Sequence, residues 1–335
     1  MALKNSFKIT LVLMLILLGG TYICSAAVEF TDTTGQLITL PKPAERVVCL
    51  NSDAAEMMIA LGIGERVVGV VETTTTDPIL MSHLPHAVSV GNWQTPSAER
   101  LLSLNPDAII AYSSSRPKNA DQLVNAGIRL IYLDCYKVNT LEHDVSALGI
   151  MTGTEKNAEK YLNFFRKWRD VVTEMIQNVS TTDEPLVYIE GYTDFTAQGP
   201  DSGTDLLVRM AKGKNMAEDL KEQWPKVTPE WVISKNPGII LKMVSVKPDT
   251  NLDQVRKSII ERTGFENLSA IQNNRVYVLN GDLAFGPRCP AGLVYIAKCL
   301  YPNAFADIHP SDVLDEYART FVSGTAEGEY FSPVL

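Results

Sequence analysis

The histidines of this sequence are the first candidates for metal chemistry. His83 and His86 are spaced three residues apart, with Pro85 between them. His143 and His309 stand alone, and the sequence has no other histidine. A protein zinc site needs three or four nitrogen, sulfur or carboxylate ligands in a tetrahedral arrangement. The residues around the HxxH pair are typical of a loop, so we expect solvated side chains there and no metal site.

Motifs that hold phosphates or activate nucleophiles are absent as well. Gly62-Ile63-Gly64 with Gly69 resembles a glycine-rich nucleotide turn, but it follows a predicted helix and precedes a predicted strand. That order is the wrong one for a loop that cradles phosphate. The sequence contains no P-loop, no GxSxG and no HExxH. We therefore expect no catalytic residues and no resident cofactor.

Short strands alternate with helices along most of the chain. An antiparallel pair is predicted at 28–31 and 36–40. Strands follow at 46–50, 67–71, 108–112 and 129–133, with helices at 54–61, 98–104 and 121–126. After residue 185 the alternation restarts, with strands at 186–189, 239–243 and 276–279 and helices at 204–211, 230–234, 290–300 and 312–321. This pattern is typical of α/β domains with parallel sheets.

One long amphipathic helix separates the two series. Apolar side chains recur at i, i+3, i+4, i+7 spacing from Ala158 to Ile176, and no Gly or Pro interrupts residues 155–179. Thr152 and Glu155 predict a capping box at its start. At 1.5 Å per residue the helix would be about 37 Å long, enough to cross a whole domain.

Two distant segments repeat one pattern. Glu99 and Glu230 each lie near the start of a predicted helix, and Ser follows four residues later, Asn six and Pro seven, ahead of an apolar strand. The repeat predicts two lobes of one design with a cleft between them. We therefore predict two Rossmann-like α/β lobes joined by one interlobe helix. The expected boundaries are 28–152 for the N-terminal lobe, 153–180 for the linker helix and 181–335 for the C-terminal lobe.

Residues 1–27 are typical of a secretory signal peptide. Lys4 and Lys8 precede an apolar run, and small residues occupy positions −3 and −1 of a cut after Ala27. An uncut anchor is the alternative, since no charge occurs in residues 9–28, a length that could span a bilayer. We expect an exported protein at the periplasmic or extracellular face of the cell membrane.

Composition and charge narrow the class of partner. The 335 residues are 45% hydrophobic and 21% charged, which excludes a disordered chain or a disulfide scaffold. With 30 basic and 39 acidic residues the net charge is −9, and no basic run follows the N-terminus. Phosphate backbones require concentrated positive charge, so nucleic acid is excluded as a partner. A small ligand or a basic protein surface fits better.

The cysteines do not form a metal-binding motif. Cys24 would leave with the signal peptide, and the sequence has no CxxC. Disulfides between Cys49 and Cys135 or between Cys289 and Cys299 are possible, and buried free thiols are the alternative.

Several short motifs occur in a fixed order along the chain. They are Arg46-Val47-Val48 with Ala55-Glu56 and Ala60-Leu61-Gly62, then Gly91-Asn92-Trp93 with Leu104-Asn105-Pro106-Asp107, and then Trp224-Pro225 with Glu230 and Pro237. Together with the long helix they resemble the substrate-binding proteins of ABC importers for iron complexes and vitamin B12, the Fe/B12 periplasmic-binding family of class III. The likeness runs from about residue 28 to residue 322. It implies two α/β lobes tied by one helix that hinge little.

The resemblance implies a docking site on each lobe. In this family a surface glutamate of each lobe enters an arginine pocket of the membrane permease, and Glu99 and Glu230 are the matching positions. Both are acids in the first turn of equivalent predicted helices, where a carboxylate also stabilises the helix by about 0.3–1 kcal/mol. Charge reversal at either position should reduce transport and leave ligand affinity unchanged.

The resemblance also implies a ligand between the lobes. Aromatic contacts of vitamin B12-binding members match Trp93, Phe195 and Trp224, and polar contacts match Asp282 and Arg288. Aromatic faces cover apolar ligand surface, and arginine pairs with carboxylate or phosphate. Packing of Trp93 in the protein and a surface ion pair of Arg288 are the structural alternatives. Thr73 stands where those members have a tyrosine, so a ferric siderophore-type complex and a corrinoid both stay open.

We therefore predict an exported, monomeric substrate-binding protein that captures a metal chelate and delivers it to the permease of an ABC importer with its cytoplasmic ATPase. A membrane-anchored receptor or sensor with an uncut N-terminal helix is one alternative. A chelatase-like enzyme on the same two-lobed scaffold is another, although the sequence offers no catalytic constellation. A carrier of free zinc or manganese is disfavoured by the few histidines.

Overall fold

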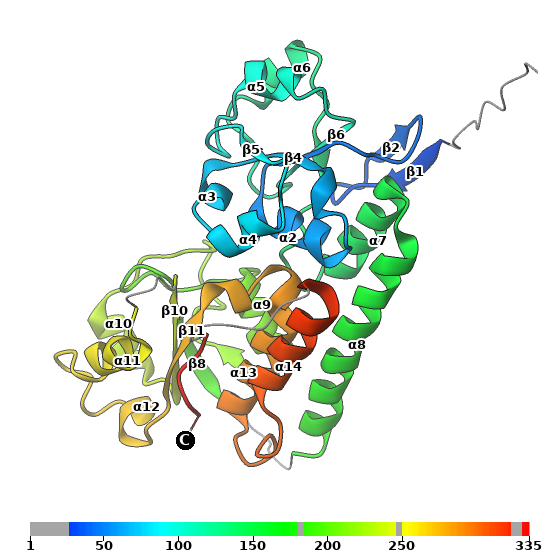
Figure 1. The fold of residues 1–335 in the computed structure, drawn as a ribbon. Coiled ribbons are helices and arrows are strands. Elements are labelled where there is room, and N and C mark those ends of the chain that lie inside the picture. The colour runs from blue at the N-terminus through cyan, green and yellow to red at the C-terminus, as the bar shows by residue number, and fades with distance from the viewer. Residues whose placement is uncertain (1–26, 180–183, 246–249, 323–329, 335) are drawn as a thin grey trace, which may run out of the picture.

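The computed structural model describes residues 27–179, 184–245, 250–322 and 330–334. Two α/β bodies are stacked on one another, and one long helix runs beside both of them (Figure 1). Residues 1–26 of the predicted signal peptide, Cys24 among them, lie outside the described residues. Within the described part of the chain, no helix has both the length and the apolar character that a membrane span requires.

Five parallel strands form the sheet of the first body, here called the N-lobe. Their order is β5-β4-β3-β6-β7, and a separate antiparallel hairpin precedes them. The strands are β1 (Val28–Thr31), β2 (Leu37–Leu40), β3 (Val47–Cys49), β4 (Val67–Val70), β5 (Val88–Ser89), β6 (Ala108–Ala111) and β7 (Ile131–Tyr132). The helices are α2 (Ser52–Ala60), α3 (Glu72–Thr75), α4 (Pro78–Ser82), α5 (Ala98–Ser103), α6 (Ala120–Asn125) and α7 (Leu141–Thr152), with a short turn η1 (Gly64–Arg66). Every residue of β3, β4 and β6 is buried, as expected of strands covered on both faces.

Four parallel strands form the sheet of the second body, the C-lobe, in the order β11-β10-β8-β9. They are β8 (Leu186–Glu190), β9 (Lys214–Asn215), β10 (Ile239–Val244) and β11 (Val276–Asn280). The helices are α9 (Gly203–Met210), α10 (Pro229–Lys235), α11 (Leu252–Ile260), α12 (Ser269–Gln272), α13 (Cys289–Leu300) and α14 (Pro310–Tyr317). Short helical turns occur at η2 (Gly281–Leu283), η3 (Gly286–Arg288) and η4 (Ala318–Val322).

The two lobes repeat one topology, which confirms the predicted fold class. In each lobe the first parallel strand lies between the strand that follows it and a later one, so β4-β3-β6-β7 corresponds to β9-β8-β10-β11. The repeated motif keeps its local geometry too. Asn105 and Asn236 both adopt left-handed backbone with φ of 44° and 45°, and each precedes a proline that leads into the strand. Asparagine tolerates this conformation better than most residues, which explains its presence at both helix ends.

The interlobe helix is α8 (Glu155–Gln177), which begins where the sequence predicts. The predicted capping box is wrong, because Thr152 is the last residue of α7 and its hydroxyl donates to the Leu148 carbonyl at 2.7 Å. Gly153 then ends α7 with a left-handed φ of 67°. The sequence pattern did not indicate α7, so the position of Thr152 was misinterpreted.

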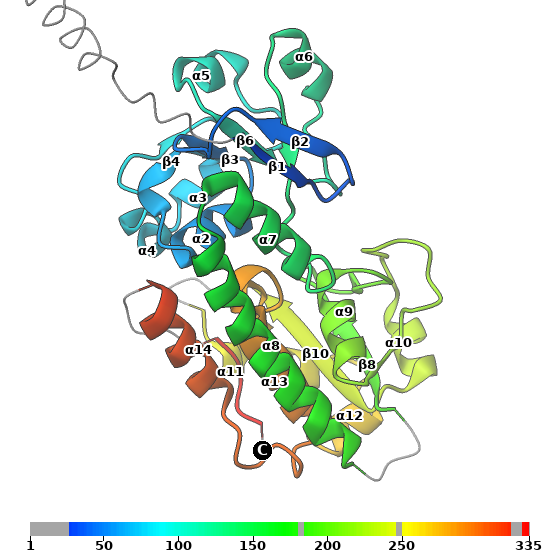
Figure 2. The ribbon, with the colours of Figure 1, turned by 90° about the vertical axis from the view of Figure 1, so that its right-hand side faces the viewer.

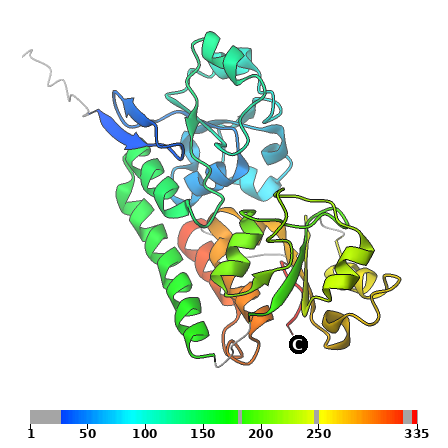
Figure 3. The same cartoon turned by 180° about the vertical axis from the view of Figure 1, so that it is seen from behind.

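Helix α8 packs against both lobes. In Figure 2 it crosses in front of both bodies, with α14 beside it. Phe164 packs on Phe321 of η4 with ring centroids 5.4 Å apart, and the Tyr161 hydroxyl donates to the Pro287 carbonyl at 2.9 Å. The view from behind shows α8 along the outer edge of both bodies (Figure 3). All four described cysteines are free and buried, so none of the possible disulfides is present.

Candidate functional site

Residues that follow the parallel strands of the two lobes contact one another. Tyr136 follows β7 and packs on Phe285, which follows β11, with ring centroids 5.9 Å apart. The backbone N–H of Gly286 donates to the Tyr136 carbonyl at 3.1 Å. In open α/β sheets, ligands bind beyond the carboxyl ends of the strands. Here the carboxyl ends of both sheets face the same interlobe region, which is therefore the candidate site.

Four aromatic rings form a continuous row across this region, here called the aromatic row. Trp93 meets Tyr112 at 6.1 Å and 86°, and Tyr112 meets Tyr136 at 5.5 Å and 88°. The Tyr136 ring then reaches Phe285 of the C-lobe. Edge-to-face pairs of this kind hold the rings in fixed orientations. All four side chains are only partly buried, so part of each ring stays available to a ligand.

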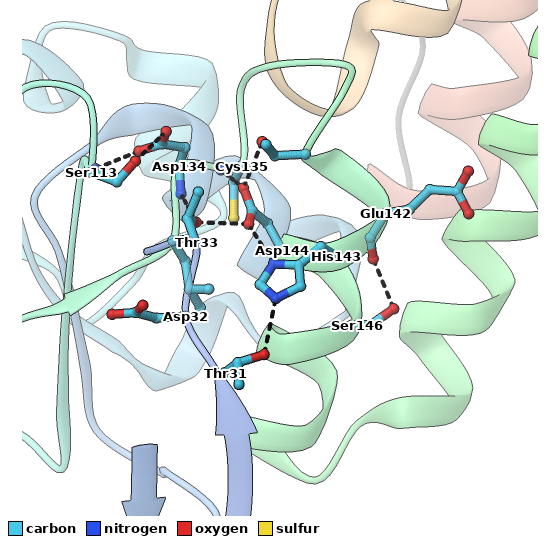
Figure 4. A network of polar contacts seen from close by, with 12 residues as sticks. Thr31, Asp32, Thr33, Ser113, Asp134, Cys135, Glu142, His143, Asp144 and Ser146 are labelled. Atoms are coloured by element: carbon cyan, nitrogen blue, oxygen red, sulfur yellow. Dashed lines mark hydrogen bonds and ion pairs between the residues drawn. The ribbon is translucent and has the colours of Figure 1, made fainter. Parts of the chain in front are cut away.

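A polar network involves Asp134 and Cys135, which directly precede Tyr136 in the loop after β7 (Figure 4). Asp144 of α7 is fully buried and accepts a hydrogen bond from the backbone N–H of Cys135 at 2.9 Å. Cys135 has a left-handed φ of 53°, which this bond helps to maintain. Asp134 accepts hydrogen bonds from the backbone and the hydroxyl of Ser113, which follows β6. These hydrogen bonds join the loop after β6 to the loop after β7, two residues before Tyr136.

An ion pair joins the lobes beside the aromatic row. Arg288 Nε lies 2.8 Å from Glu56 Oε1, and its Nη1 lies 3.8 Å from Asp282 Oδ2. Glu56 belongs to α2 of the N-lobe, and the Tyr317 hydroxyl donates to its Oε1 at 3.0 Å. Burial alone would lower the pKa of Arg288, but the carboxylates of Glu56 and Asp282 outweigh burial and raise it. Arg288 is therefore charged and already paired.

A third carboxyl group lies at the same boundary. Asp53 follows β3, and its Oδ2 accepts a hydrogen bond from the Tyr112 hydroxyl at 2.9 Å. Gly286 has a φ of +60°, and a Cβ atom on it would lie only 2.7 Å from Asp53 Oδ1. Burial, with smaller contributions from the charges of Glu56 and Asp282, raises the pKa of Asp53 to about 7. The Tyr112 hydrogen bond and Arg288 partly oppose this rise.

Phe195 is fixed by a group of charged side chains inside the C-lobe. Its backbone N–H donates to Glu190 Oε1 at 2.9 Å, and the Arg262 guanidinium lies 4.6 Å from its ring centroid. Glu190 also pairs with Arg262 at 2.6 Å and with Lys242 at 3.3 Å. Asp194 lies 2.9 Å from the Lys242 ammonium and 3.1 Å from the Arg262 guanidinium. The two cations of this group are thus matched by two carboxylates.

The remaining aromatic residue of the predicted site, Trp224, lies on the neighbouring segment. Its side chain is 59% exposed. The next residue, Pro225, accepts a hydrogen bond from the Ala197 N–H at 2.9 Å, and Val227 donates to the Phe195 carbonyl at 2.8 Å. Phe195 and Trp224 therefore lie on adjacent segments of the C-lobe, whereas Trp93 joins the aromatic row from the N-lobe.

The two predicted docking glutamates occupy equivalent surface positions. Glu99 on α5 and Glu230 on α10 are both exposed, each two residues after a side-chain N-cap. Hydrogen bonds from its own backbone and from Thr228 lower the pKa of Glu230. An exposed aliphatic residue follows each glutamate by three positions: Leu102 is 53% exposed and Ile233 is 38% exposed. Residues three apart share one helix face, so each lobe presents an acid beside an apolar side chain.

Sequence reasoning missed several residues of this region. They are Asp53, Glu56 as an ion-pair partner, Tyr112, Tyr136 and Phe285. A usable signal existed for most of them, because they directly follow predicted strands of a parallel sheet. In the described part of the chain, no group of three or more His, Cys, Asp or Glu side chains is arranged to hold a metal ion.

Known proteins and one protein family match most of this chain. Residues 47–283 match the family described as periplasmic binding protein. The chain is 27% identical to the uncharacterized ABC transporter substrate-binding lipoprotein YvrC of Bacillus subtilis (strain 168), over 84% of this chain and 87% of that protein. It is 28% identical to the vitamin B12-binding protein of Yersinia pestis (strain Pestoides F), over 61% of this chain and 72% of that protein.

Solved structures show the same fold. The TroA-like periplasmic binding protein FepB from Veillonella parvula superposes with a TM-score of 0.76 and 25% identity, covering 91% of this chain and 99% of that one. The molybdate-binding protein MolA from Haemophilus influenzae superposes with a TM-score of 0.76 and 19% identity, covering 89% and 99%.

Proposed function

The chain belongs to the periplasmic binding protein family and is a substrate-binding protein of an ABC transporter, and on that premise we propose that it carries a metal chelate. The chelate would be taken up between the two lobes and delivered to the membrane permease. Members of this family bind their substrates and do not convert them. The protein would therefore act by capture, docking and release, with no covalent step.

The aromatic row is the observation that carries this proposal. Trp93 and Tyr112 of the N-lobe lead through Tyr136 to Phe285 of the C-lobe, so a ligand at this boundary would contact aromatic side chains from both lobes. Aromatic faces supply large contact areas at little entropic cost, which suits a bulky, partly apolar ligand. A small bare ion would need a cluster of ligating groups rather than rings.

We propose a chelate of the corrinoid or ferric-siderophore type, and the sequence relatives support the corrinoid. A vitamin B12-binding protein is among the relatives that match most of their own length. The proposed ligand contacts are Trp93, Phe195, Trp224 and Asp282. Arg288, whose charge is paired with Glu56, would hold Asp282 in place and approach the ligand with its remaining N–H groups.

We also propose that α5 and α10 are the two docking surfaces for the permease. Each offers a glutamate and an exposed aliphatic residue on one face: Glu99 with Leu102, and Glu230 with Ile233. Exposed apolar side chains beside a charge are a common composition for an interface. The two surfaces occupy equivalent places in lobes of one topology, which suits a permease built from two related halves.

Ligand titration is the direct test. The purified protein is titrated with cobalamin, cobinamide, haem and ferric siderophores, and binding is followed by calorimetry and by tryptophan fluorescence. We expect at least one chelate to bind and to quench fluorescence, with Trp93→Phe removing much of the quenching. Trp168→Phe, on α8, is the control and should leave the quenching in place. If none of these chelates binds, the metal-chelate proposal is wrong, whereas the family assignment stands.

Export and the division of the chain are further parts of the proposal. Relatives and structural neighbours are described as periplasmic binding proteins or as a lipoprotein. We infer that residues 1–27 direct export and that the lobes span 28–152 and 181–335, joined by 153–180. N-terminal sequencing of the exported protein distinguishes cleavage after Ala27 from a retained anchor.

A further inference from the structure

The charges between the lobes indicate what kind of chelate fits there. We propose that this surface selects an uncharged or cationic chelate that bears hydrogen-bond donors, such as amides or amines, and that it rejects polyanionic chelates. The inference rests on the proposed function, because it assumes that the ligand lies between the lobes. It adds the charge class of that ligand.

Three cations of the described C-lobe residues near the boundary are already paired with carboxylates. Arg288 is paired with Glu56 at 2.8 Å. In the C-lobe, Lys242 and Arg262 are shared between Glu190 and Asp194, as described above. A polyanionic ligand needs cationic donors whose charge is not already compensated. These three side chains would have to abandon buried partners to supply such donors.

A fourth cation, Lys137, lies against the aromatic row. Its ammonium lies 5.5 Å from the centroid of the Tyr136 ring, in a cation–π contact. Burial raises the pKa of Asp134, and the charge of Lys137 is among the effects that oppose this rise. Lys137 is thus already engaged with a ring and an acid of its own loop.

Two carboxyl groups lie next to the aromatic row. Asp282 follows β11, and its side chain is 55% exposed and lies 3.8 Å from Arg288, whose closer partner is Glu56. Asp53 adds a second carboxyl group, hydrogen-bonded to Tyr112. A carboxylate accepts hydrogen bonds and cannot donate them when ionised. The part of the surface next to the aromatic row therefore favours donors and positive charge.

Besides burial, neighbouring carboxylates contribute to the raised pKa of Asp53. Burial is the largest cause that raises its pKa, and the charges of Glu56 and Asp282 raise it further. Arg288 lowers that pKa but does not cancel the other effects. A ligand carboxylate or catecholate placed here would meet the same repulsion.

Calorimetric titration with chelates of different charge tests the inference. The probes are cationic cobinamide, cobalamin with no net charge, haem with two carboxylates, and a ferric tris-catecholate. We expect the cationic or uncharged chelates to bind at least about tenfold more tightly than the polyanionic ones. Asp282→Lys should narrow or reverse that preference, since it replaces the exposed carboxylate by a cation. Asp219→Lys, at an exposed acid elsewhere on the C-lobe, is the matched control and should leave the preference unchanged.

The outcomes separate this inference from the proposed function. If a polyanionic chelate binds as tightly as the others, or if only polyanions bind, the metal-chelate function stands and the charge class is wrong. An unchanged preference in Asp282→Lys would also overturn the inference. If no chelate of any charge binds, the proposed ligand class and its charge both fail.

Discussion

Arg288 of η3 and Glu56 of α2 form an ion pair between the two lobes, with Nε and Oε1 2.8 Å apart. The hydroxyl of Tyr317 donates to the same carboxylate, and the hydroxyl of Tyr161 in α8 donates to Pro287, the neighbour of Arg288. Elements of the N-lobe, the C-lobe and the interlobe helix therefore meet at one place. Polar contacts of this density restrict how far the lobes can separate, in line with a binding protein whose lobes hinge little.

Removing Glu56 should destabilise the protein strongly. Glu56→Ala leaves the Arg288 guanidinium without its main partner at a site where both side chains are mostly buried. An unpaired buried charge costs about 3 kcal/mol or more in the free energy of unfolding. Urea denaturation followed by circular dichroism measures the change. The control is Glu261→Gln, which breaks the exposed pair between Lys257 and Glu261 and should cost less than about 0.5 kcal/mol. Equal costs for the two variants would contradict a special role of the interlobe pair.

Asp53 should make stability fall with rising pH. Its pKa of about 7 in the folded protein lies above the ordinary value, mainly because of burial. The folded state therefore holds more protons than the unfolded state between about pH 4 and pH 7, and the free energy of unfolding decreases across that interval. Asp53→Asn should flatten this dependence and stabilise the protein at pH 8 relative to wild type. Thermal melts from pH 5 to pH 8 measure it, with Asp219→Asn as a control that should retain the wild-type slope.

Gly286 should tolerate no side chain. Its φ of +60° disfavours other residues, and a Cβ atom would lie 2.7 Å from Asp53 Oδ1. Gly286→Ala should therefore lower the melting temperature and weaken ligand binding, because the contact between Gly286 and Tyr136 would shift. Gly35→Ala separates the cost of the positive φ from the cost of the steric contact. Gly35 also has a positive φ, +80°, but a Cβ atom there would meet nothing within 4 Å. That variant carries only the backbone cost, about 1 kcal/mol. A smaller effect at Gly286 than at Gly35 would argue against close packing between the lobes.

Tyr136 should contribute to ligand affinity through its place in the middle of the aromatic row. Tyr136→Leu removes its ring contacts with Tyr112 and Phe285. A ligand face packed on Tyr136 would lose an aromatic contact worth about 0.5–1.5 kcal/mol, so we expect chelate affinity to fall up to about tenfold. Calorimetric titration gives the affinity, and an unchanged far-ultraviolet spectrum verifies the fold. Tyr132→Leu, on β7 and outside the row, should bind like wild type; a comparable loss there would indicate a general effect on the N-lobe.

The exposed aliphatic residues on α5 and α10 should matter for transport alone. Leu102→Ser and Ile233→Ser remove apolar surface beside Glu99 and Glu230 without burying a polar group. We expect each to reduce uptake into cells or permease-containing vesicles several-fold, with chelate affinity unchanged. Leu37→Ser is the control, because Leu37 of β2 is 60% exposed and lies on the hairpin rather than on a docking helix. Full uptake by both docking variants would show that the aliphatic residues take no part in docking.

The hydrophobic pattern indicates most of the fold, because a buried parallel strand and an amphipathic helix each leave a periodic trace. Helix α8 and the strands of both sheets lie where that trace places them, except the two-residue strands β5 and β9, which are too short to leave a periodic pattern. The pattern fails at α7, whose buried residues include Asp144 and whose last residue is Thr152. In α7 the choice of buried side chains is determined by tertiary hydrogen bonds, such as the one that the Cys135 N–H donates to Asp144, and not by helical periodicity.

The sequence by itself determined the class of the protein: two α/β units of one design, one connecting helix, and an acid repeated at Glu99 and Glu230. These features are local, since each follows from residues that are near one another in the chain. Only the tertiary structure decided which side chains meet between the lobes. Glu56 and Arg288 are 232 positions apart, and the row from Trp93 to Phe285 exists only because two sheets turn their carboxyl ends toward one another. Ion pairing and ring contacts act over a few ångströms of space, whatever the distance along the chain.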